Sequence, residues 1–339
     1  MRAVRVEGAF GLERVALTTL EAPAPAAGQL LLRVRAASLN YRDLLVAKGE
    51  YNPNYPLPLI LGSDAVAEVV AFGAGSEHSG LSLGDRVCPL MVQAWFDGAP
   101  PRSATRSTLG GPLPGVFAEY VIARADSVLR VPDYLDDVEA ACLPCAALTA
   151  WSALKTLAPI AAGDTVLTLG SGGVSLFALQ VARLSGARVL ATSRGTKKRE
   201  RLLSLGAEAV LDASEAGWGR SARALCGDEG VDHVVELGGA STLGESLAAV
   251  RPGGTISLIG VLSGKQAALN LLPLVMRNVR LQGVFVGHKQ SFAELLSAFE
   301  ANSVHPVVDS VFPLREFGRA FERLASGQHF GKVCLRVAE

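Results

Sequence analysis

A glycine-rich turn between an apolar strand and a helix is the feature that most restricts the fold of this chain. Residues 164–169, DTVLTL, form an apolar run, and the sequence GSGGVS follows it directly. A helical pattern, GVSLFALQVARLSG, begins within the turn and stops at Gly186. Glycines let the backbone approach a pyrophosphate, and the free N–H groups of a helix N-terminus attract the anion. Because the turn follows a strand and opens a helix, it predicts a dinucleotide site formed by Gly170, Ser171, Gly172, Gly173 and Val174.

Strand and helix patterns alternate from about residue 147 onward. The apolar strands RVLATS, EAVLD, VDHVVE and TISLIGVL are separated by helical or turn-rich segments. Alternation of this kind is typical of a parallel sheet that helices cover on both faces. Ser175 stands at the third glycine position of the fingerprint, and it is small enough for close helix packing. We therefore expect an α/β fold with a Rossmann doubly wound parallel sheet.

The end of the second strand of this region indicates which dinucleotide is bound. NAD-binding chains place an acidic residue there, which bonds the ribose 2′-hydroxyl. Here the sequence ATSRGTKKR puts Ser193 at the position, with Arg194 and Lys198 close by. A hydroxyl and two cations suit a 2′-phosphate, which a carboxylate would repel. We expect NADPH as the cofactor. The alternative is a solvated basic helix start, although positive charge opposes the helix dipole at that end.

The first 130 residues read differently and suggest a second domain. Short β-type runs such as QLLLRVRAASL alternate apolar with polar residues, as half-buried antiparallel strands do. A chain of 339 residues also exceeds one ordinary domain of roughly 100–200 residues. Residues 91–114 are rich in Gly, Pro, Ser and Thr and predict a long surface loop, in which Trp95 and Phe96 either line a pocket or anchor the loop.

Composition excludes several classes of function. Thirty-two basic and thirty-two acidic residues balance, so a nucleic-acid partner is not expected. No apolar run is long enough to span a bilayer, and the first residues do not resemble a secretory leader, so the expected location is the cytoplasm. Of five dispersed cysteines, only Cys142 and Cys145 are closely spaced. They follow a capping-box pattern at Asp136 and Glu139, and we interpret them as buried, inert thiols rather than a redox pair.

The whole chain resembles the medium-chain dehydrogenase/reductase superfamily. The matching segments run from end to end in the family's order: ASLNYRDLLVAKGEY, LGSDAVAEVVAFGAG, LGDRV, GVFAEYV, the glycine turn, VRPGGTISLIGV and GKVCLRV. The resemblance implies a GroES-like, β-rich catalytic domain from residues 1–146 and 287–339, and a Rossmann domain from residues 147–286. It also implies a homodimer formed through the edge of the Rossmann sheet, where TISLIGVL is the strand that a partner would cover.

The resemblance further indicates that zinc is absent. In the zinc-dependent alcohol dehydrogenases of the superfamily, cysteine and histidine ligands stand at the positions of Asn40, Ser63 and Cys145. One thiol with an amide and a hydroxyl is a poor zinc set, since a catalytic site needs about three protein ligands. Asp64 is expected to be a hydrogen-bonded structural carboxylate rather than a ligand. Residues 102–125 also lack the clustered cysteines that hold a structural zinc.

Without a metal, the chemistry is expected to be conjugate reduction. The zinc-independent quinone oxidoreductases and enoyl reductases of the superfamily reduce activated C=C bonds, and their pattern N-x-x-D-x-x-x-x-x-G-x-Y matches Asn40, Asp43, Gly49 and Tyr51. By resemblance, Asn40 and Tyr51 face the nicotinamide and an unsaturated carbonyl substrate: an enone, a quinone or an enoyl thioester such as enoyl-CoA. Tyr51 would donate its hydroxyl to the carbonyl oxygen, with Tyr55 as the rival donor. Asp43 would orient its neighbours, by pairing with Arg42 or with a backbone amide.

The resemblance supplies the remaining cofactor contacts. Two of these positions have structural alternatives: Thr149 could bond its own helix turn, and Lys332 could be a solvated surface lysine. His288 is left unassigned. The expected contacts are Thr149 with the nicotinamide, Gly260, Val261, Leu262, Phe285 and Val286 with the carboxamide, and Lys332 near the phosphates.

Two other classes of function stay open. An NADP(H)-dependent alcohol or aldehyde dehydrogenase would oxidise alcohols, and metal analysis would support it. A non-catalytic nucleotide-binding protein would bind NADPH tightly without turnover.

Overall fold

The computed structural model describes residues 1–338, which form two compact units. The terminal unit comprises Met1–Ala146 and His288–Glu339, and the central unit comprises Ala147–Gly287. Both ends of the chain therefore build one domain, and the second boundary lies one residue after the expected end at residue 286. The expected α/β fold class, with a β-rich domain and a parallel Rossmann sheet, is confirmed.

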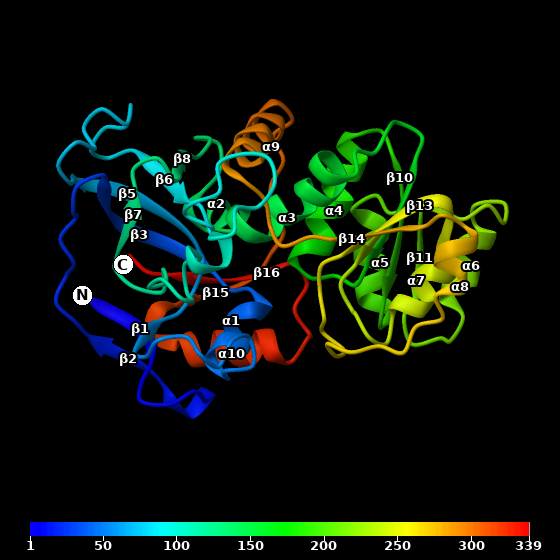
Figure 1. The fold of residues 1–339 in the computed structure, drawn as a ribbon, viewed down its shortest axis with the longest axis horizontal. Coiled ribbons are helices and arrows are strands. Elements are labelled where there is room, and N and C mark those ends of the chain that lie inside the picture. The colour runs from blue at the N-terminus through cyan, green and yellow to red at the C-terminus, as the bar shows by residue number, and fades with distance from the viewer. Residues whose placement is uncertain (339) are drawn as a thin grey trace. The chain divides into compact units, whose positions relative to one another are not determined.

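The terminal unit is built around a seven-stranded sheet (Figure 1). Its path runs β15-β16-β3-β5-β6-β8, and β7 pairs with β3. Buried and half-buried residues alternate along β3, as the sequence pattern predicts for an antiparallel strand. The strands of this sheet are β3 (Gln29–Ser38), β5 (Asp64–Phe72), β6 (Arg86–Pro89), β7 (Tyr120–Arg124), β8 (Val128–Arg130), β15 (Val308–Pro313) and β16 (Lys332–Arg336).

A smaller sheet and several short helices complete the terminal unit. The small sheet has the order β2-β1-β4, with β1 at Arg2–Val6, β2 at Val15–Thr19 and β4 at Leu59–Ile60. Both helices expected in the tail are present, and β16 follows them as the expected last strand. The helical segments are η1 (Leu12–Arg14), α1 (Tyr41–Ala47), η2 (Ala104–Arg106), α2 (Asp137–Ala140), α9 (Lys289–Ala301), η5 (Leu314–Glu316) and α10 (Phe317–Ala325), and η3 (Leu143–Ala147) reaches the boundary of the unit.

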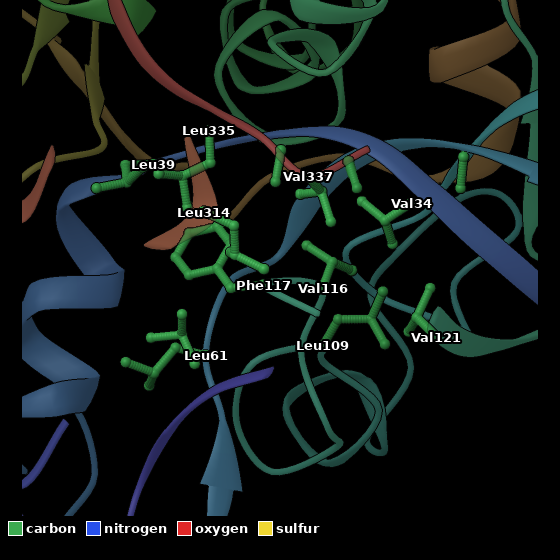
Figure 2. Packing of buried hydrophobic residues seen from close by; sticks show 14 of the residues in the cluster. Val34, Leu39, Leu61, Leu109, Val116, Phe117, Val121, Leu314, Leu335 and Val337 are labelled. Carbon is green, nitrogen blue, oxygen red and sulfur yellow. The ribbon is translucent and has the colours of Figure 1, made fainter. Parts of the chain in front are cut away.

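The core of the terminal unit lies around Phe117 (Figure 2). This fully buried ring belongs to a cluster that also contains Leu61, Leu314 and Leu335. Gly62 packs against the same ring, because a Cβ built there would lie 2.3 Å from the Phe117 side chain. Its φ of 90° also favours glycine. A glycine is thus needed at position 62, directly before Ser63 and the start of β5 at Asp64.

The central unit has a six-stranded sheet of the Rossmann type (Figure 1). All neighbouring strands are parallel, in the order β11-β10-β9-β12-β13-β14. The strands are β9 (Thr165–Leu169), β10 (Arg188–Ser193), β11 (Ala209–Asp212), β12 (Val231–Glu236), β13 (Val250–Leu258) and β14 (Arg280–Gly283). The helical segments are α3 (Leu148–Trp151), η4 (Ser152–Leu157), α4 (Gly173–Leu184), α5 (Thr196–Ser204), α6 (Trp218–Ala224), α7 (Leu243–Ala249) and α8 (Leu272–Met276).

The edge of this sheet differs from the expectation. TISLIGVL was expected to be the exposed strand, but β13 is paired on both sides and β14 forms the edge. The sequence missed β14 because RLQG is short and mostly polar.

The segment at residues 91–114 also differs from the expected surface loop. Its two ends are buried, including Trp95 and Leu109, and only its middle is largely exposed. The Trp95 indole N–H donates to the Gly98 carbonyl at 3.1 Å, and its ring packs edge-on to His288. Trp95 thus anchors the loop. Among residues 1–338, no helix is long and apolar enough to cross a membrane.

Candidate active site

Three strand ends of the terminal unit meet where the sequence places its polar candidates. Ser38 at the end of β3 pairs with Asp64 at the start of β5, and with Cys334 in β16. Since β16 runs antiparallel to β3, two further residues along each strand bring Lys332 level with Asn40. The register therefore joins residues that lie almost 300 positions apart in the sequence.

Lys332 and Asn40 are the centre of a buried polar cluster. The Lys332 ammonium donates to the Asn40 Oδ1 at 2.6 Å and to the Leu39 carbonyl at 2.8 Å. It lies 3.8 Å from Asp64 Oδ2. Asn40 Nδ2 lies 3.4 Å from the Ser63 hydroxyl, which itself donates to Asp64 Oδ1 at 2.9 Å. Lys332, Ser63 and Asp64 are almost wholly inaccessible to solvent, whereas Asn40 is half-buried.

The Lys332 ammonium and the Asp64 carboxylate each stabilise the charged form of the other. Burial lowers the pKa of the Lys332 ammonium, but the Asp64 carboxylate and the thiol groups of Cys142, Cys145 and Cys334 together outweigh burial, so the pKa is raised. Burial also raises the pKa of Asp64, although Lys332 and several hydrogen bonds favour its ionised form. Asp64 Oδ2 accepts the backbone N–H of Cys145 at 3.2 Å. Asp64 is therefore the hydrogen-bonded structural carboxylate that the sequence led us to expect.

These residues do not suit zinc. Burial raises the pKa of Cys145 to about 12, with the Asp64 carboxylate adding to the effect, so Cys145 carries a neutral thiol beside the Asp64 carboxylate. The Asn40 oxygen that would face a metal is already bonded to the Lys332 ammonium. A second cation beside that ammonium would be repelled. Within residues 1–338, no three His, Cys, Asp or Glu residues are grouped as metal ligands.

Helix α1 carries the next candidates. Asn40 precedes the helix, and its backbone N–H donates to the Asp43 carboxylate at 2.8 Å. Asp43 also lies 3.5 Å from the Arg42 guanidinium, so it contacts both partners considered from the sequence. Burial raises the pKa of Asp43 to about 6, even though Arg42 and the Asn40 N–H favour the carboxylate. Asp43 is an orienting group for the start of the helix.

Tyr51 and Tyr55 lie near each other beyond α1. Their ring centroids are 6.4 Å apart, and Tyr51 is the more exposed of the two, at 37%. The Arg42 guanidinium lies over the Tyr51 ring, 5.2 Å from its centroid. Arg42 also donates to the Leu109 carbonyl at 3.1 Å, so it fixes the loop and the ring together. A positioning role for Arg42 was not predicted from the sequence, because the pattern NYRD does not distinguish a buried arginine from a solvated one.

The glycine turn of the central unit has the geometry that the sequence predicts. Gly170 has a φ of 81°, and α4 starts at Gly173 with Gly172 as its N-cap. Gly172 has no side chain to cap the helix, so the first N–H groups can serve an anion. Ser175 is buried, and its hydroxyl donates to the Leu169 carbonyl at 2.6 Å. The serine at the third glycine position therefore packs closely and satisfies its own hydroxyl. These residues fit a dinucleotide pyrophosphate.

The residues expected at the adenosine ribose lie together after β10. Ser193 is buried at the end of the strand, Arg194 is exposed, and Lys198 lies in the first turns of α5. The neighbouring cation, Arg199, is bound by Asp212 at 2.7 Å. The structure thus presents a hydroxyl and basic side chains at this strand end.

The segment expected to hold the carboxamide lies against a turn that Glu236 organises. A Cβ at Gly260 would come 2.1 Å from the Leu237 carbonyl oxygen, so the two backbones approach closely. The fully buried Glu236 carboxylate accepts the N–H groups of Gly238 and Gly239 at 2.7 and 3.0 Å and the Thr242 hydroxyl at 2.6 Å. Our sequence reasoning missed Glu236, although an acid that ends a buried strand was a usable signal.

The remaining candidates divide between the two units. Thr149 is buried in α3, Val261 and Leu262 are exposed after β13, and Phe285 and Val286 follow β14. Lys332 was expected near the cofactor phosphates, with a solvated lysine as the alternative. It is neither solvated nor directed outward, because its ammonium is bonded inside the terminal unit. Cys142 is buried after the predicted capping box of Asp136 and Glu139, which is present.

Comparisons with known proteins agree with this architecture. Residues 26–133 match the alcohol dehydrogenase GroES-like domain, and residues 173–301 match the zinc-binding dehydrogenase domain. The chain is 38% identical to a zinc-type alcohol dehydrogenase-like protein of Schizosaccharomyces pombe, over 91% of each chain. It is 30% identical to the acryloyl-coenzyme A reductase of Metallosphaera sedula, over 99% of each chain. A mycobacterial structure in complex with NADPH is 29% identical and has a TM-score of 0.86, with 99% of this chain and 100% of that chain covered.

The two matched domains together span more than half of the chain and fall in both units, and the relatives match nearly end to end. The strand order and the glycine turn place the nucleotide fold in the centre of the chain. The chain therefore belongs to the medium-chain dehydrogenase/reductase superfamily of oxidoreductases.

Proposed function

We propose that the protein is a zinc-independent, NADPH-dependent reductase of activated C=C bonds. The substrate class is an α,β-unsaturated carbonyl compound: an enone, a quinone or an enoyl thioester such as enoyl-CoA. The observation that carries the proposal is the Lys332 ammonium bonded to Asn40 at 2.6 Å, among the positions where zinc-dependent relatives hold their metal. The acryloyl-coenzyme A reductase relative supports the thioester as one member of the class.

The chemistry follows from where negative charge develops. Alcohol oxidation needs an alkoxide to be stabilised at the carbon that loses hydride, and a metal does this well. In conjugate reduction the electron pair of the C=C bond moves to the distant carbonyl oxygen, and ordinary hydrogen-bond donors hold that enolate. Bound NADPH supplies the hydride that the β-carbon accepts. The enolate then collapses as its α-carbon takes a proton.

Asn40 and Tyr51 are the proposed donors to the carbonyl oxygen. Asn40 is half-buried, and its Nδ2 carries two N–H bonds, of which the Ser63 hydroxyl takes one at 3.4 Å. Tyr51 is exposed enough to meet a ligand, and the Arg42 guanidinium lies over its ring. Asp43 holds the backbone of Asn40.

The cofactor proposal rests on the central unit. Gly170, Ser171, Gly172, Gly173 and Val174 would hold the pyrophosphate, and Ser193, Arg194 and Lys198 would hold the 2′-phosphate. The turn braced by Glu236 would present the backbone of Gly260, Val261 and Leu262 to the carboxamide, together with Thr149, Phe285 and Val286. The mycobacterial relative has been solved in complex with NADPH, which agrees with the proposed cofactor.

We also propose that the protein is a homodimer. The edge strand β14 has backbone groups without a strand partner on one side. Exposed apolar side chains gather in the same unit on and beside α8, namely Leu271, Leu272, Val275 and Met276, each more than 60% exposed. A second copy of the chain would pair the edge and cover this surface.

The test is NADPH oxidation with a panel of enones, quinones and enoyl-CoAs. Replacing Tyr51 by Phe removes the hydroxyl and keeps the ring over Arg42, so we expect kcat/KM to fall roughly 10²–10³-fold. Tyr41→Phe is the matched control, because Tyr41 is as exposed as Tyr51 and lies nearby in the sequence, at the start of α1. Unchanged turnover in the Tyr51 variant would remove Tyr51 as a donor.

A second candidate is an alcohol or aldehyde dehydrogenase, which the name of the Schizosaccharomyces pombe relative favours. NADP⁺-dependent oxidation of alcohols together with stoichiometric zinc in the purified protein would decide for it. The main proposal expects full NADPH oxidation after prolonged treatment with a chelator.

A further inference from the structure

The Lys332 ammonium is enclosed by oxygen atoms in a place where a charged group is costly. Its side chain is 3% exposed, and it donates to the Leu39 carbonyl and the Asn40 side chain. Asp64 supplies the opposite charge at 3.8 Å. A buried ammonium with this set of partners is held in one position, because any movement would leave it unpaired.

The ammonium determines which way round the Asn40 amide lies. An ammonium has three donors and no acceptor, so only the amide oxygen can face it. Turning the amide over would place an NH2 group against a positive charge. The backbone N–H of Asn40 is held separately by the Asp43 carboxylate, in the capping box at the start of α1.

The hydrogen bonds at Asp64 favour the same orientation of the Asn40 amide. The Asp64 carboxylate can only accept, and it takes the Ser63 hydroxyl proton at 2.9 Å. The Ser63 oxygen is then left as an acceptor toward Asn40 Nδ2. Every bond from Lys332 through Asn40 and Ser63 to Asp64 therefore runs one way, from a group that only donates to one that only accepts.

We propose that Lys332 is a positioning residue, which keeps Asn40 turned so that its amide nitrogen is the donor to the carbonyl oxygen of the ligand. It acts through Asn40 and does not contact the substrate. The inference rests on the proposed role of Asn40 in conjugate reduction, but the orientation of the amide can be measured without any reaction.

The orientation is tested by nuclear magnetic resonance on ¹⁵N-labelled protein. Asn40→Asp identifies the side-chain NH2 signals of Asn40 by their loss, and keeps an acceptor for the ammonium. In Lys332→Met we expect the Asn40 signals to shift and to broaden as the amide samples both orientations. Lys289→Met is the matched control, since Lys289 also donates to a backbone carbonyl in the terminal unit but is exposed. Unchanged Asn40 signals in Lys332→Met would overturn the inference.

A kinetic cycle tests the path through Asn40. If Lys332 acts only through Asn40, then Lys332→Met and Asn40→Ala each lower kcat, and the double variant is no slower than Asn40→Ala alone. We expect a loss of roughly 10-fold or more in kcat, with the KM for NADPH within about twofold of the native value. Losses that multiply in the double variant would show a separate role and contradict the proposal.

One further variant keeps the test decisive, and the NMR result separates failure of the inference from failure of the proposed function. If Lys332→Met does not fold, Ser63→Ala interrupts the same chain at a small buried hydroxyl, and the Asn40 signals are expected to shift there as well. If no acceptor is reduced, the proposed function fails, while the NMR result still decides the orientation of Asn40.

Discussion

The Arg42 guanidinium lies 5.2 Å from the centroid of the Tyr51 ring and also donates to the Leu109 carbonyl at 3.1 Å. Arg42 is 8% exposed and has the buried Asp43 at 3.5 Å as its counter-ion. Arg42, which belongs to helix α1, therefore contacts both the loop at residues 91–114 and Tyr51, the proposed donor. A flat guanidinium can do this, because it stacks on a ring and donates in its own plane at the same time.

Replacing Arg42 by Met should destabilise the terminal unit and weaken the proposed site. It leaves Asp43 buried without its counter-ion, and removing one partner of a buried pair costs about 3–5 kcal/mol. Urea unfolding measures this loss, and kcat/KM with the best acceptor should fall as Tyr51 loses its support. Arg319→Met is the control, because Arg319 also lies over a ring, that of Phe312, but is 69% exposed. Its loss is expected to stay below about 1 kcal/mol. Equal losses in the two variants would refute the role given to Arg42.

Asp43 should make stability depend on pH. Its pKa is raised to about 6 by burial, whereas the unfolded carboxyl titrates near 4. The folded chain therefore holds this proton more tightly, and the stability gained below about pH 4 is lost as the pH rises through about 6. Between pH 4.5 and 7.5, the free energy of unfolding should fall by about 2 kcal/mol in the native protein relative to Asp43→Asn.

Asp126 provides the control for this titration. It is 52% exposed, and its Arg124 partner lowers its pKa despite partial burial. Relative to Asp126→Asn, the native protein should therefore show no comparable fall in the free energy of unfolding over the same pH range. If Asp43→Asn tracks the native protein at every pH, the carboxyl is not titrating where we place it.

The sequence could predict the elements of this fold better than their contacts. The strand, turn and helix around Gly170 are local, so their residues alone carry the prediction. Asn40, Ser63 and Cys145 were grouped because relatives hold zinc there, and the structure brings them around Asp64. Lys332 could not be added to that group from the sequence, because its partner lies 292 residues away and depends on the register of β16 against β3.

The same limit explains the other differences. The strand β14 is short and mostly polar, so its place at the sheet edge is set by pairing with β13 and not by periodicity. Arg42 is a buried charge, and the pattern NYRD does not tell a buried arginine from a solvated one. Glu236 could be suspected from its place at the end of a buried strand, but its hydrogen-bond partners could not be predicted. In each case tertiary contacts decide what local pattern leaves open.

The basic strand end at Ser193 should set the choice between NADPH and NADH. Replacing Ser193 by Asp puts a carboxylate where the 2′-phosphate is proposed to bind. It also restores the acidic residue that bonds the ribose 2′-hydroxyl in NAD-binding chains. We expect the KM for NADPH to rise roughly 10-fold or more, because the new carboxylate repels the 2′-phosphate. The KM for NADH should fall. Initial rates with both cofactors measure it. Ser214→Asp, on the neighbouring turn after β11, is the control. Retained preference for NADPH in Ser193→Asp would mean that the ribose is read elsewhere.

The apolar surface at α8 should control assembly. Leu272 and Val275 of α8 are 63% and 69% exposed, in the same unit as the edge strand β14, which has one unpaired side. Replacing both by Lys would force charges into the proposed dimer interface, where leaving them buried and unpaired costs several kcal/mol. Sedimentation velocity should therefore show a dimer for the native protein and a monomer for the double variant, with far-UV circular dichroism unchanged. Leu83→Lys is the matched control, because Leu83 is equally exposed but lies in the terminal unit, and it should leave the dimer intact. A native protein that sediments as a monomer at micromolar concentration, or a double variant that stays dimeric, would show that this surface does not pair two copies of the chain.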